Sequence, residues 1–266
     1  MDWRQGAWPL FKCLRALCWA GVAACLTPIA TAAPKPGTVE VVSEAWNDYT
    51  SADGTGLGWD LIRIIFEPAG YKVMWRIEPY LRSVGLVQRG EADAWVGSYE
   101  NERDALYPSW HYDTDHIYAL SLASHSAPIL ATLGDARLAW VRGYEFQRYL
   151  PGIKHYEHIE RRNGILEMLK RGHADFYIDA EQEMDFIQQQ EADPSQYRLT
   201  HLIDLPLYLG FANNPRGREL CKVYDKRMAE LVASGALKPL YRRWKMAYPF
   251  GNEPMPRKTS IEACDR

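Results

Sequence analysis

The sequence has no long apolar run, no low-complexity tract, no heptad repeat and no cluster of basic residues. No segment reaches the ~20 uncharged residues that span a bilayer, so we expect no transmembrane helix. The net charge of -3 and the absence of a basic patch argue against a nucleic-acid partner. The length of 266 residues allows one large domain or two small ones with a compact core.

Sequence motifs for catalysis are also missing. The chain contains no G-x-S-x-G, G-x-x-x-x-G-K, H-E-x-x-H or C-x-x-C motif, so we predict no catalytic residue, cofactor or metal. His155 and His158 stand beside two glutamates but would need a further ligand to bind a metal. We expect both histidines on the surface.

The first 32 residues have the pattern of a secretory signal peptide. Three basic residues precede an uncharged apolar run at 16–26, and Ala30-Thr31-Ala32 supplies a small-residue cleavage site. The sequence 22–25 also resembles a bacterial lipobox, in which Cys25 would be lipidated, but we favour simple cleavage after Ala32. The mature protein is therefore expected in the periplasm.

Cysteine is scarce in the mature chain. Of five cysteines, three lie in the predicted signal peptide, which leaves Cys221 and Cys264. Two thiols exported to an oxidising compartment are expected to form a disulfide.

Strand and helix patterns alternate in the first part of the mature chain. β-branched or apolar runs predict strands, and one-sided apolar spacing that ends near Pro or Gly predicts helices. The predicted elements are strands at 38–43, 72–77 and 93–97 and helices at 59–66 and 80–88. This alternation is typical of βαβ units with a parallel sheet.

A second α/β block follows. After an apolar stretch at 117–123, the predicted elements are strands at 136–141, 174–178 and 206–212 and helices at 163–171, 180–190, 217–233 and 237–245. The proline-containing tail from Tyr248 is expected on the surface.

Five sequence motifs, in the order in which they follow one another along the chain, resemble those of the bacterial family-3 extracellular solute-binding proteins. The first block contains Gly58–Ile62, Leu86–Ala94 and Glu102-Arg103, and the second contains Trp140–Tyr144 and Leu169–Asp179. The run from Leu231 to Trp244 is similar to the family's closing helices. The resemblance covers nearly all of residues 38–246.

The resemblance implies an α/β, two-lobe type II periplasmic binding protein fold with two crossover hinge strands. Lobe 1 would comprise residues 33–120 and 210–266, and lobe 2 residues 121–209. It further implies a monomer that captures a small polar metabolite, an amino acid or a related carboxylate or amine, between closing lobes. Its partner would be an inner-membrane ABC permease or a sensor.

Ligands of open α/β sheets bind beyond the carboxyl ends of the strands. The aromatic and polar residues at those places in the first block are Glu44, Trp46, Tyr80, Arg82, Ser98 and Glu100. Aromatic faces with a few directed polar groups suit a small metabolite. Alternatively, Trp46 and Tyr80 simply cover the sheet edge.

Arg103 stands where the family places its carboxylate-binding arginine, and a guanidinium can clamp a carboxylate through two hydrogen bonds. Alternatively, Arg103 forms a structural ion pair with Asp60 or Asp104. The family's threonine three residues earlier is Glu100 here, which would repel a ligand carboxylate.

Asp179 occupies the position where amino-acid binders of the family hold the ligand ammonium. It could equally cap the following helix, with Gln182 as capping-box partner. Across from it, Arg142 and Tyr144 are expected to begin a helix whose free N-H groups favour an anion. Arg142 could instead pair with a surface acid.

Two other functions stay open at this point. The superfamily includes exported dehydratases of cyclic acids, so an enzyme resembling cyclohexadienyl dehydratase is one alternative, with Glu100, Glu44 or Asp179 as general acid. A ligand-sensing receptor component is the other.

Overall fold

Parallel strands and intervening helices build the first lobe, as the alternation predicts. We describe a computed structural model in which residues 37–189, 193–251 and 263–264 are placed, all within one compact unit. The predicted signal peptide and Cys25 lie outside the described residues. The elements are β1 (Thr38–Ser43), α1 (Leu57–Phe66), β2 (Lys72–Ile77), α2 (Tyr80–Gln88) and β3 (Ala94–Tyr99). β1 pairs in parallel with both β2 and β3.

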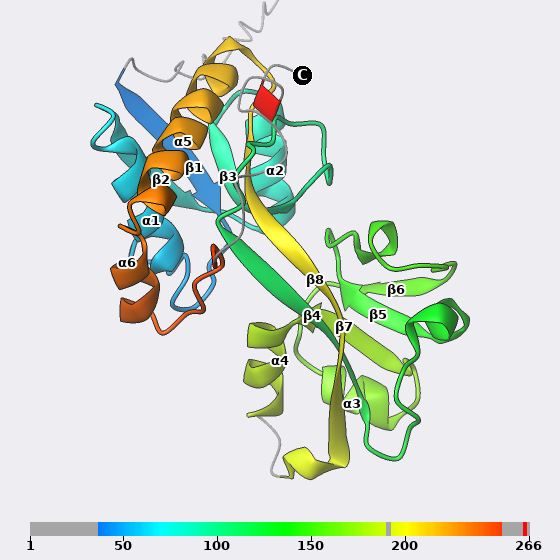
Figure 1. Ribbon diagram of the computed structural model, residues 1–266. Coiled ribbons are helices and arrows are strands. Elements are labelled where there is room, and N and C mark those ends of the chain that lie inside the picture. The colour runs from blue at the N-terminus through cyan, green and yellow to red at the C-terminus, as the bar shows by residue number, and fades with distance from the viewer. Residues whose placement is uncertain (1–36, 190–192, 252–262, 265–266) are drawn as a thin grey trace, which may run out of the picture. The chain divides into compact units, whose positions relative to one another are not determined.

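Two long strands connect this lobe to the second. β4 (Asp113–Leu122) and β8 (Tyr197–Phe211) run antiparallel along each other, side by side in Figure 1. β8 pairs with β3 from Leu207 onward, and β4 pairs with β7 from Ile117 onward. The strand order is β2-β1-β3-β8-β4-β7-β5-β6, so β4 and β8 are the crossover strands between the lobes.

The second lobe repeats the arrangement with shorter elements. They are β5 (Leu138–Val141), β6 (Tyr156–Ile159), α3 (Ile165–Lys170), β7 (Phe176–Ala180) and α4 (Glu181–Gln188), with 3-10 turns at Leu130–Asp135, Phe146–Arg148 and Pro194–Gln196. β5 pairs in parallel with β6 and β7. The predicted lobe boundaries at 120/121 and 209/210 fall inside β4 and β8, and they stay a prediction.

The last two helices return to the first lobe. α5 (Pro215–Ala233) packs on α1 and β8, and α6 (Lys238–Arg243) also contacts α1. Asn214 caps α5 by accepting a hydrogen bond from the Gly217 N-H at 2.8 Å, with Pro215 in the first turn. Among the described residues, no helix is long and apolar enough to cross a membrane.

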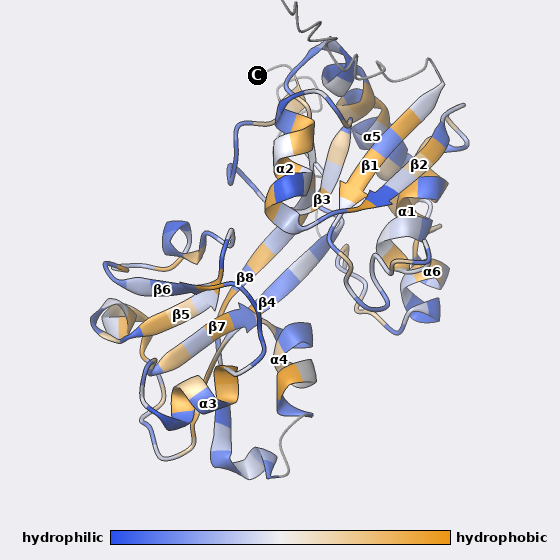
Figure 2. Cartoon of the chain, turned by 180° about the vertical axis from the view of Figure 1, so that it is seen from behind, coloured by the Kyte–Doolittle hydropathy of each residue, from blue (hydrophilic) through white to orange (hydrophobic). Residues whose placement is uncertain are grey.

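The apolar residues concentrate between the sheet and the helices of each lobe. Figure 2 shows apolar positions along β1, β3 and β5. The core of the first lobe includes Trp59, Phe66 and Tyr224, and a separate cluster in the second lobe includes Ile165, Tyr177 and Met184, all at most 2% exposed. The larger cluster also includes Trp140, Phe146 and Ile178, so one apolar core continues from the first lobe into the second, and the second lobe adds a smaller cluster of its own.

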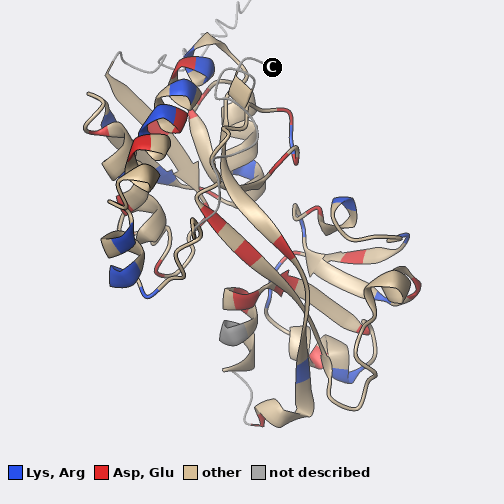
Figure 3. Cartoon of the chain, viewed as in Figure 1, with Lys and Arg blue, Asp and Glu red and all other residues tan. Residues whose placement is uncertain are grey.

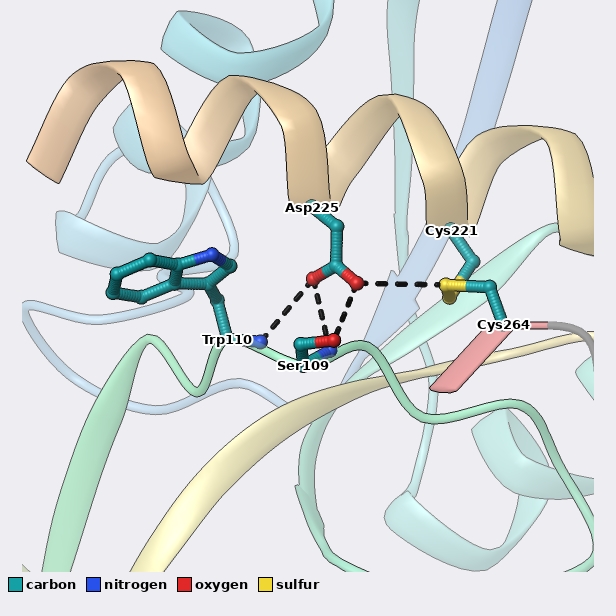
Figure 4. The surroundings of a disulfide bond; sticks show 5 residues. All are labelled: Ser109, Trp110, Cys221, Asp225 and Cys264. Carbon is teal, nitrogen blue, oxygen red and sulfur yellow. Dashed lines mark hydrogen bonds between the residues drawn. A yellow bond between two sulfur atoms is a disulfide. The ribbon is translucent and has the colours of Figure 1, made fainter. Parts of the chain in front are cut away.

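Cys221 on α5 and Cys264 near the chain end are paired by the structure, with their Cα atoms 5.8 Å apart (Figure 4). Beside them the buried carboxylate of Asp225 accepts hydrogen bonds from the N-H groups of Ser109 at 2.9 Å and Trp110 at 3.2 Å. The Cys264 sulfur lies 3.7 Å from the same carboxylate. Burial raises the pKa of Asp225. This cluster attaches the end of the chain and the loop before β4 to α5.

The structure departs from the predicted elements most clearly at β6 and β8, and the apolar stretch predicted at 117–123 is the end of the strand β4. β6 is an edge strand with exposed Glu157 and His158, so it has no apolar run to reveal it. β8 begins at Tyr197, nine residues before the predicted strand. Pro206 lies within it, opposite Thr114 of β4 and just before the first β3 pair at Leu207. The missing N-H of Pro206 therefore costs no ladder bond to β3.

Candidate functional site

A cavity of about 630 Å³, including its part open to solvent, lies where both lobes meet the crossover strands. Its position beyond the ends of β1, β3 and β7 agrees with the rule for open α/β sheets. The lining residues are Trp46, Tyr49, Tyr80, Gly97, Tyr99 and Glu102 from the first lobe, Tyr144, Asp179, Ala180, Gln182 and Glu183 from the second, and Asp115 and Leu207 from the crossover strands.

Aromatic rings from both lobes form one wall of the cavity. The Tyr80 ring centroid lies 6.4 Å from Trp46 and 5.7 Å from Tyr144, the latter pair edge to face. Trp46 packs on Gly97, whose φ of 89° and the 2.5 Å between an added Cβ and the Trp46 ring leave room only for glycine. Tyr80 belongs to the first lobe and Tyr144 to the second, so the contact between their rings joins the two lobes at this wall.

Glu102 is a buried acid behind Tyr80. It is 2% exposed and accepts hydrogen bonds from the Tyr80 hydroxyl at 2.7 Å and the Tyr99 N-H at 3.1 Å. Burial raises the pKa of Glu102 and, more strongly, that of Tyr80. The pair fixes the orientation of the Tyr80 ring in the cavity.

Asp115 of β4 is the acid at the crossover. Its carboxylate accepts a hydrogen bond from the Tyr99 hydroxyl at 2.9 Å. Burial raises the pKa of Asp115 to about 7, and the neighbouring charges of Asp113 and Asp179 act in the same direction. Burial also raises the pKa of Asp113 to about 6. Figure 3 shows this acidic character along β4 and β8.

Asp179 lies at the second-lobe side, fully buried and bonded to Arg162. The Arg162 Nε lies 2.8 Å from Asp179 Oδ2 and 3.2 Å from Glu183 Oε2. The Tyr177 hydroxyl donates to Asp179, and Arg162 donates to the Tyr144 hydroxyl at 3.0 Å. Burial opposes the charge of Arg162, but the charge and hydrogen bond of Asp179 together with Tyr144 and Tyr177 outweigh it and raise the Arg162 pKa. Asp179 is thus part of an ion cluster at the end of β7.

A second hollow of about 990 Å³, open to solvent, adjoins the cavity and shares Trp46, Gln182 and Glu183 with it. Glu44 and Arg162 line this hollow. Burial raises the pKa of Glu44 and of Glu183.

Arg103 makes an ion pair different from the two that the sequence suggested. Its Nη1 lies 2.7 Å from Glu145 Oε1, and its Nη2 donates to the Gly143 carbonyl at 3.0 Å. Arg103 follows β3 in the first lobe, whereas Glu145 follows β5 in the second. The Arg103–Glu145 pair is therefore a bridge between the lobes, and it lies outside the set of residues that line the cavity.

The remaining predicted residues lie at the edge of the site or away from it. Ser98 is buried below the cavity, 3.2 Å from the Tyr107 hydroxyl. Arg82 is exposed and pairs with Glu78, and Arg142 pairs with Glu160 at 2.6 Å, as its alternative interpretation held. Glu100 lines a separate recess with Tyr107 and is not among the residues that line the cavity.

The residues that escaped the sequence analysis include Glu102, Asp115 and Glu183, which line the cavity, and Arg162 and Glu145, which pair with Asp179 and Arg103. Arg162 comes three residues after β6, the strand that was not predicted. Asp115 lies inside a strand rather than after one. His155 and His158 are the pair that the sequence analysis considered for a metal ion. Among the described residues, the group that could hold one is instead His116, His201 and Asp204, which lies outside this cavity.

Solved structures of other proteins share this fold, although sequence comparison finds no match. No protein-family model and no curated sequence matches the chain. A substrate-binding protein of an ABC uptake transporter from Streptococcus pneumoniae, with bound histidine, matches with a TM-score of 0.60 and 15% identity over 84% of this chain and 95% of that one.

Two further matches are an ancestral binding protein and a sensor domain. An ancestral amino-acid-binding protein, a precursor of cyclohexadienyl dehydratase, matches with a TM-score of 0.57 and 16% identity over 78% of this chain and 95% of that one. A histidine kinase sensor domain similar to periplasmic binding proteins gives 0.62 and 18% over the same shares, 78% and 95%. The predicted two-lobe periplasmic binding protein fold is confirmed.

Proposed function

We propose that the chain is a periplasmic solute-binding protein that captures an amino acid or a related amine between its lobes for an ABC-type uptake system. The observation that carries the proposal is the cavity itself, because aromatic rings and carboxylates from both lobes converge on it. A ligand that touches both lobes binds the closed state more tightly than the open one and so drives closure.

The charges around the cavity favour a ligand with a positive group. Four carboxylates line it, those of Glu102, Asp115, Asp179 and Glu183, and no Lys or Arg is among the described lining residues. The rings of Trp46, Tyr80 and Tyr144 can in addition face a cation. Amino acids and amines carry such a group, whereas a simple carboxylate does not.

The test is a thermal-shift screen of amino acids, amines and small carboxylates on the mature chain, followed by calorimetry on each hit. Saturation at about 100 times the dissociation constant stabilises the native state by about 2.7 kcal/mol, which a melting curve resolves. We expect hits among amines and amino acids. Hits confined to carboxylates without an amino group would contradict the charge argument.

The site assignment is tested on a confirmed ligand. Asp179→Asn removes a charge from the cavity, and Asp115→Asn removes an acid that a bound cation would ionise. Each is expected to weaken binding at least tenfold, since a desolvated charge contact is worth ~2 kcal/mol or more. Asp135→Asn is the matched control, because Asp135 is exposed at the end of a 3-10 turn. Equal affinity of all three variants and the unchanged protein would refute the assignment.

An exported enzyme is the second candidate, and Asp115 favours it. A carboxyl group with a pKa of about 7 in a cavity is suited to general acid-base catalysis near neutral pH. NMR of the ligand after incubation with the protein separates the two functions. A binding protein leaves the ligand unchanged; an enzyme converts it, and Asp115→Asn then abolishes conversion.

A further inference from the structure

Two histidines and an aspartate converge on the outer face of the crossover strands. The Nδ1 of His116 and the Nε2 of His201 each lie 2.7 Å from the same oxygen, Oδ1 of Asp204. The three ligand atoms lie within 4.8 Å of one another. All three side chains are close to half exposed, at 46%, 44% and 52%.

A β-bulge brings these residues together. His116 of β4 is directly opposite Asp204 of β8, and the β4–β8 ladder shifts register between Ile117 and Tyr118, where β8 has one extra residue, Leu202. Residues three apart on a regular strand face opposite sides, but the extra residue restores His201 and Asp204 to the same side. The Tyr118 ring, 5.3 Å from His201, holds that imidazole in place.

We propose that His116, His201 and Asp204 form a binding site for a divalent transition metal ion, with zinc the best match to the donors. Imidazole nitrogen and carboxylate oxygen are established zinc ligands, and three protein ligands with a fourth position open to water is a recurrent zinc geometry. Hard cations such as magnesium and calcium instead prefer oxygen-only ligands.

The dimensions allow the ion to enter. Tetrahedral bonds of about 2.0 to 2.1 Å place neighbouring ligand atoms about 3.3 Å apart. The present nitrogen-to-oxygen separations of 2.7 Å must widen slightly, which exposed side chains can do by small rotations. The metal replaces the two N-H protons that now point at Asp204. Carboxylates of Glu181 and Asp115 near His116 add a negative field that attracts a cation.

The site would connect the two crossover strands, because His116 belongs to β4 and the other two ligands to β8. An occupied site therefore crosslinks β4 and β8 close to where each changes lobes. We expect zinc to raise the melting temperature of the ligand-free protein.

The experiment titrates the tag-free mature chain with zinc chloride by calorimetry and with cobalt chloride by visible absorption. We expect one ion per chain and cobalt bands typical of nitrogen and oxygen ligation. His116→Gln, His201→Gln and Asp204→Asn should each weaken zinc binding at least about tenfold, since loss of even an outer-shell partner costs 10 to 100-fold.

His155→Gln/His158→Gln is the matched control. It removes two exposed histidines that also stand beside glutamates, and it should bind zinc as the unchanged protein does. Circular dichroism and metal-free melting curves establish that every variant is folded. Absence of zinc binding up to millimolar concentration, or equal binding by His116→Gln and the unchanged protein, would overturn the proposal.

Discussion

The bridge between Arg103 and Glu145 leads to a test of how the lobes close. Arg103 is 19% exposed at its side chain and Glu145 23%, and their atoms lie 2.7 Å apart. Charge-assisted hydrogen bonds of this kind contribute about 1.5 to 3 kcal/mol. At about 1.4 kcal/mol per factor of ten, loss of the bridge lowers the ratio of closed to open form by roughly 10- to 150-fold.

The two roles that Arg103 could have predict opposite effects of Glu145→Ala on ligand binding. If Arg103 closes the lobes, Arg103→Ala and Glu145→Ala should both weaken ligand binding by that factor, and the double variant should be no weaker than either single variant. If Arg103 instead anchors the ligand carboxylate, Glu145 competes with the ligand. Glu145→Ala should then leave binding unchanged or tighten it, while Arg103→Ala weakens it at least thirtyfold.

Calorimetry of the three variants with a confirmed ligand measures the cycle. Arg142→Ala/Glu160→Ala is the matched control, because that ion pair is as short, at 2.6 Å, but lies within one lobe and is 56% and 69% exposed. We expect the control to bind as the unchanged protein does, since exposed pairs contribute about 0 to 1 kcal/mol. Normal binding by Glu145→Ala would refute the bridge.

Three further predictions concern stability and processing. The pKa of Asp115 is raised to about 7 from ~3.9 in the unfolded chain. Its contribution to the free energy of unfolding is therefore complete below pH ~4 and is lost as the pH rises through 7. Urea unfolding at pH 5 and pH 8 should show a drop in stability on the order of 2 to 4 kcal/mol that Asp115→Asn removes; an equal drop in both proteins would contradict it. The Cys221–Cys264 loop spans 43 residues, so Cys264→Ser should destabilise the protein by roughly 3 to 4 kcal/mol, and two titratable thiols in the unreduced, unfolded protein would exclude the disulfide. Export should cleave the chain after Ala32, and an intact mass that begins at a lipidated cysteine would disprove this.

Elements with strong local signals could be predicted from the sequence. The bounds of β2 and α2 agree with the prediction at both ends. For α2 the signals are Pro79, which directly precedes the helix, and Gly90, which follows it. The edge strand β6 could not be predicted, since it has no apolar face toward a second neighbour. The first part of β8 is polar on one side and is held by its long pairing with β4, which is a tertiary effect.

The same distinction holds for the site residues, some of which have a local sequence signal while others are brought together only by the fold. Trp46 and Tyr80 were found because they follow predicted strands, and the rule for sheet edges applies there. Arg162 follows β6 in the same way and was missed together with that strand. The partners of Arg103 and Asp179 could not be predicted because Glu145 and Arg162 are brought to them only by the fold.

The ion cluster around Asp179 is a further reason to propose a ligand with a positive group. One guanidinium, that of Arg162, faces the carboxylates of Asp179 and Glu183, and its charge also acts on Glu44. Burial raises the pKa of Glu44 and Glu183 despite this guanidinium, so both carboxyl groups keep their protons to a higher pH than a free glutamate does. An ammonium group placed here would share these carboxylates with Arg162 and lower both pKa values. Ligand binding should therefore release protons at mildly acidic pH, whereas a carboxylate bound here would take protons up.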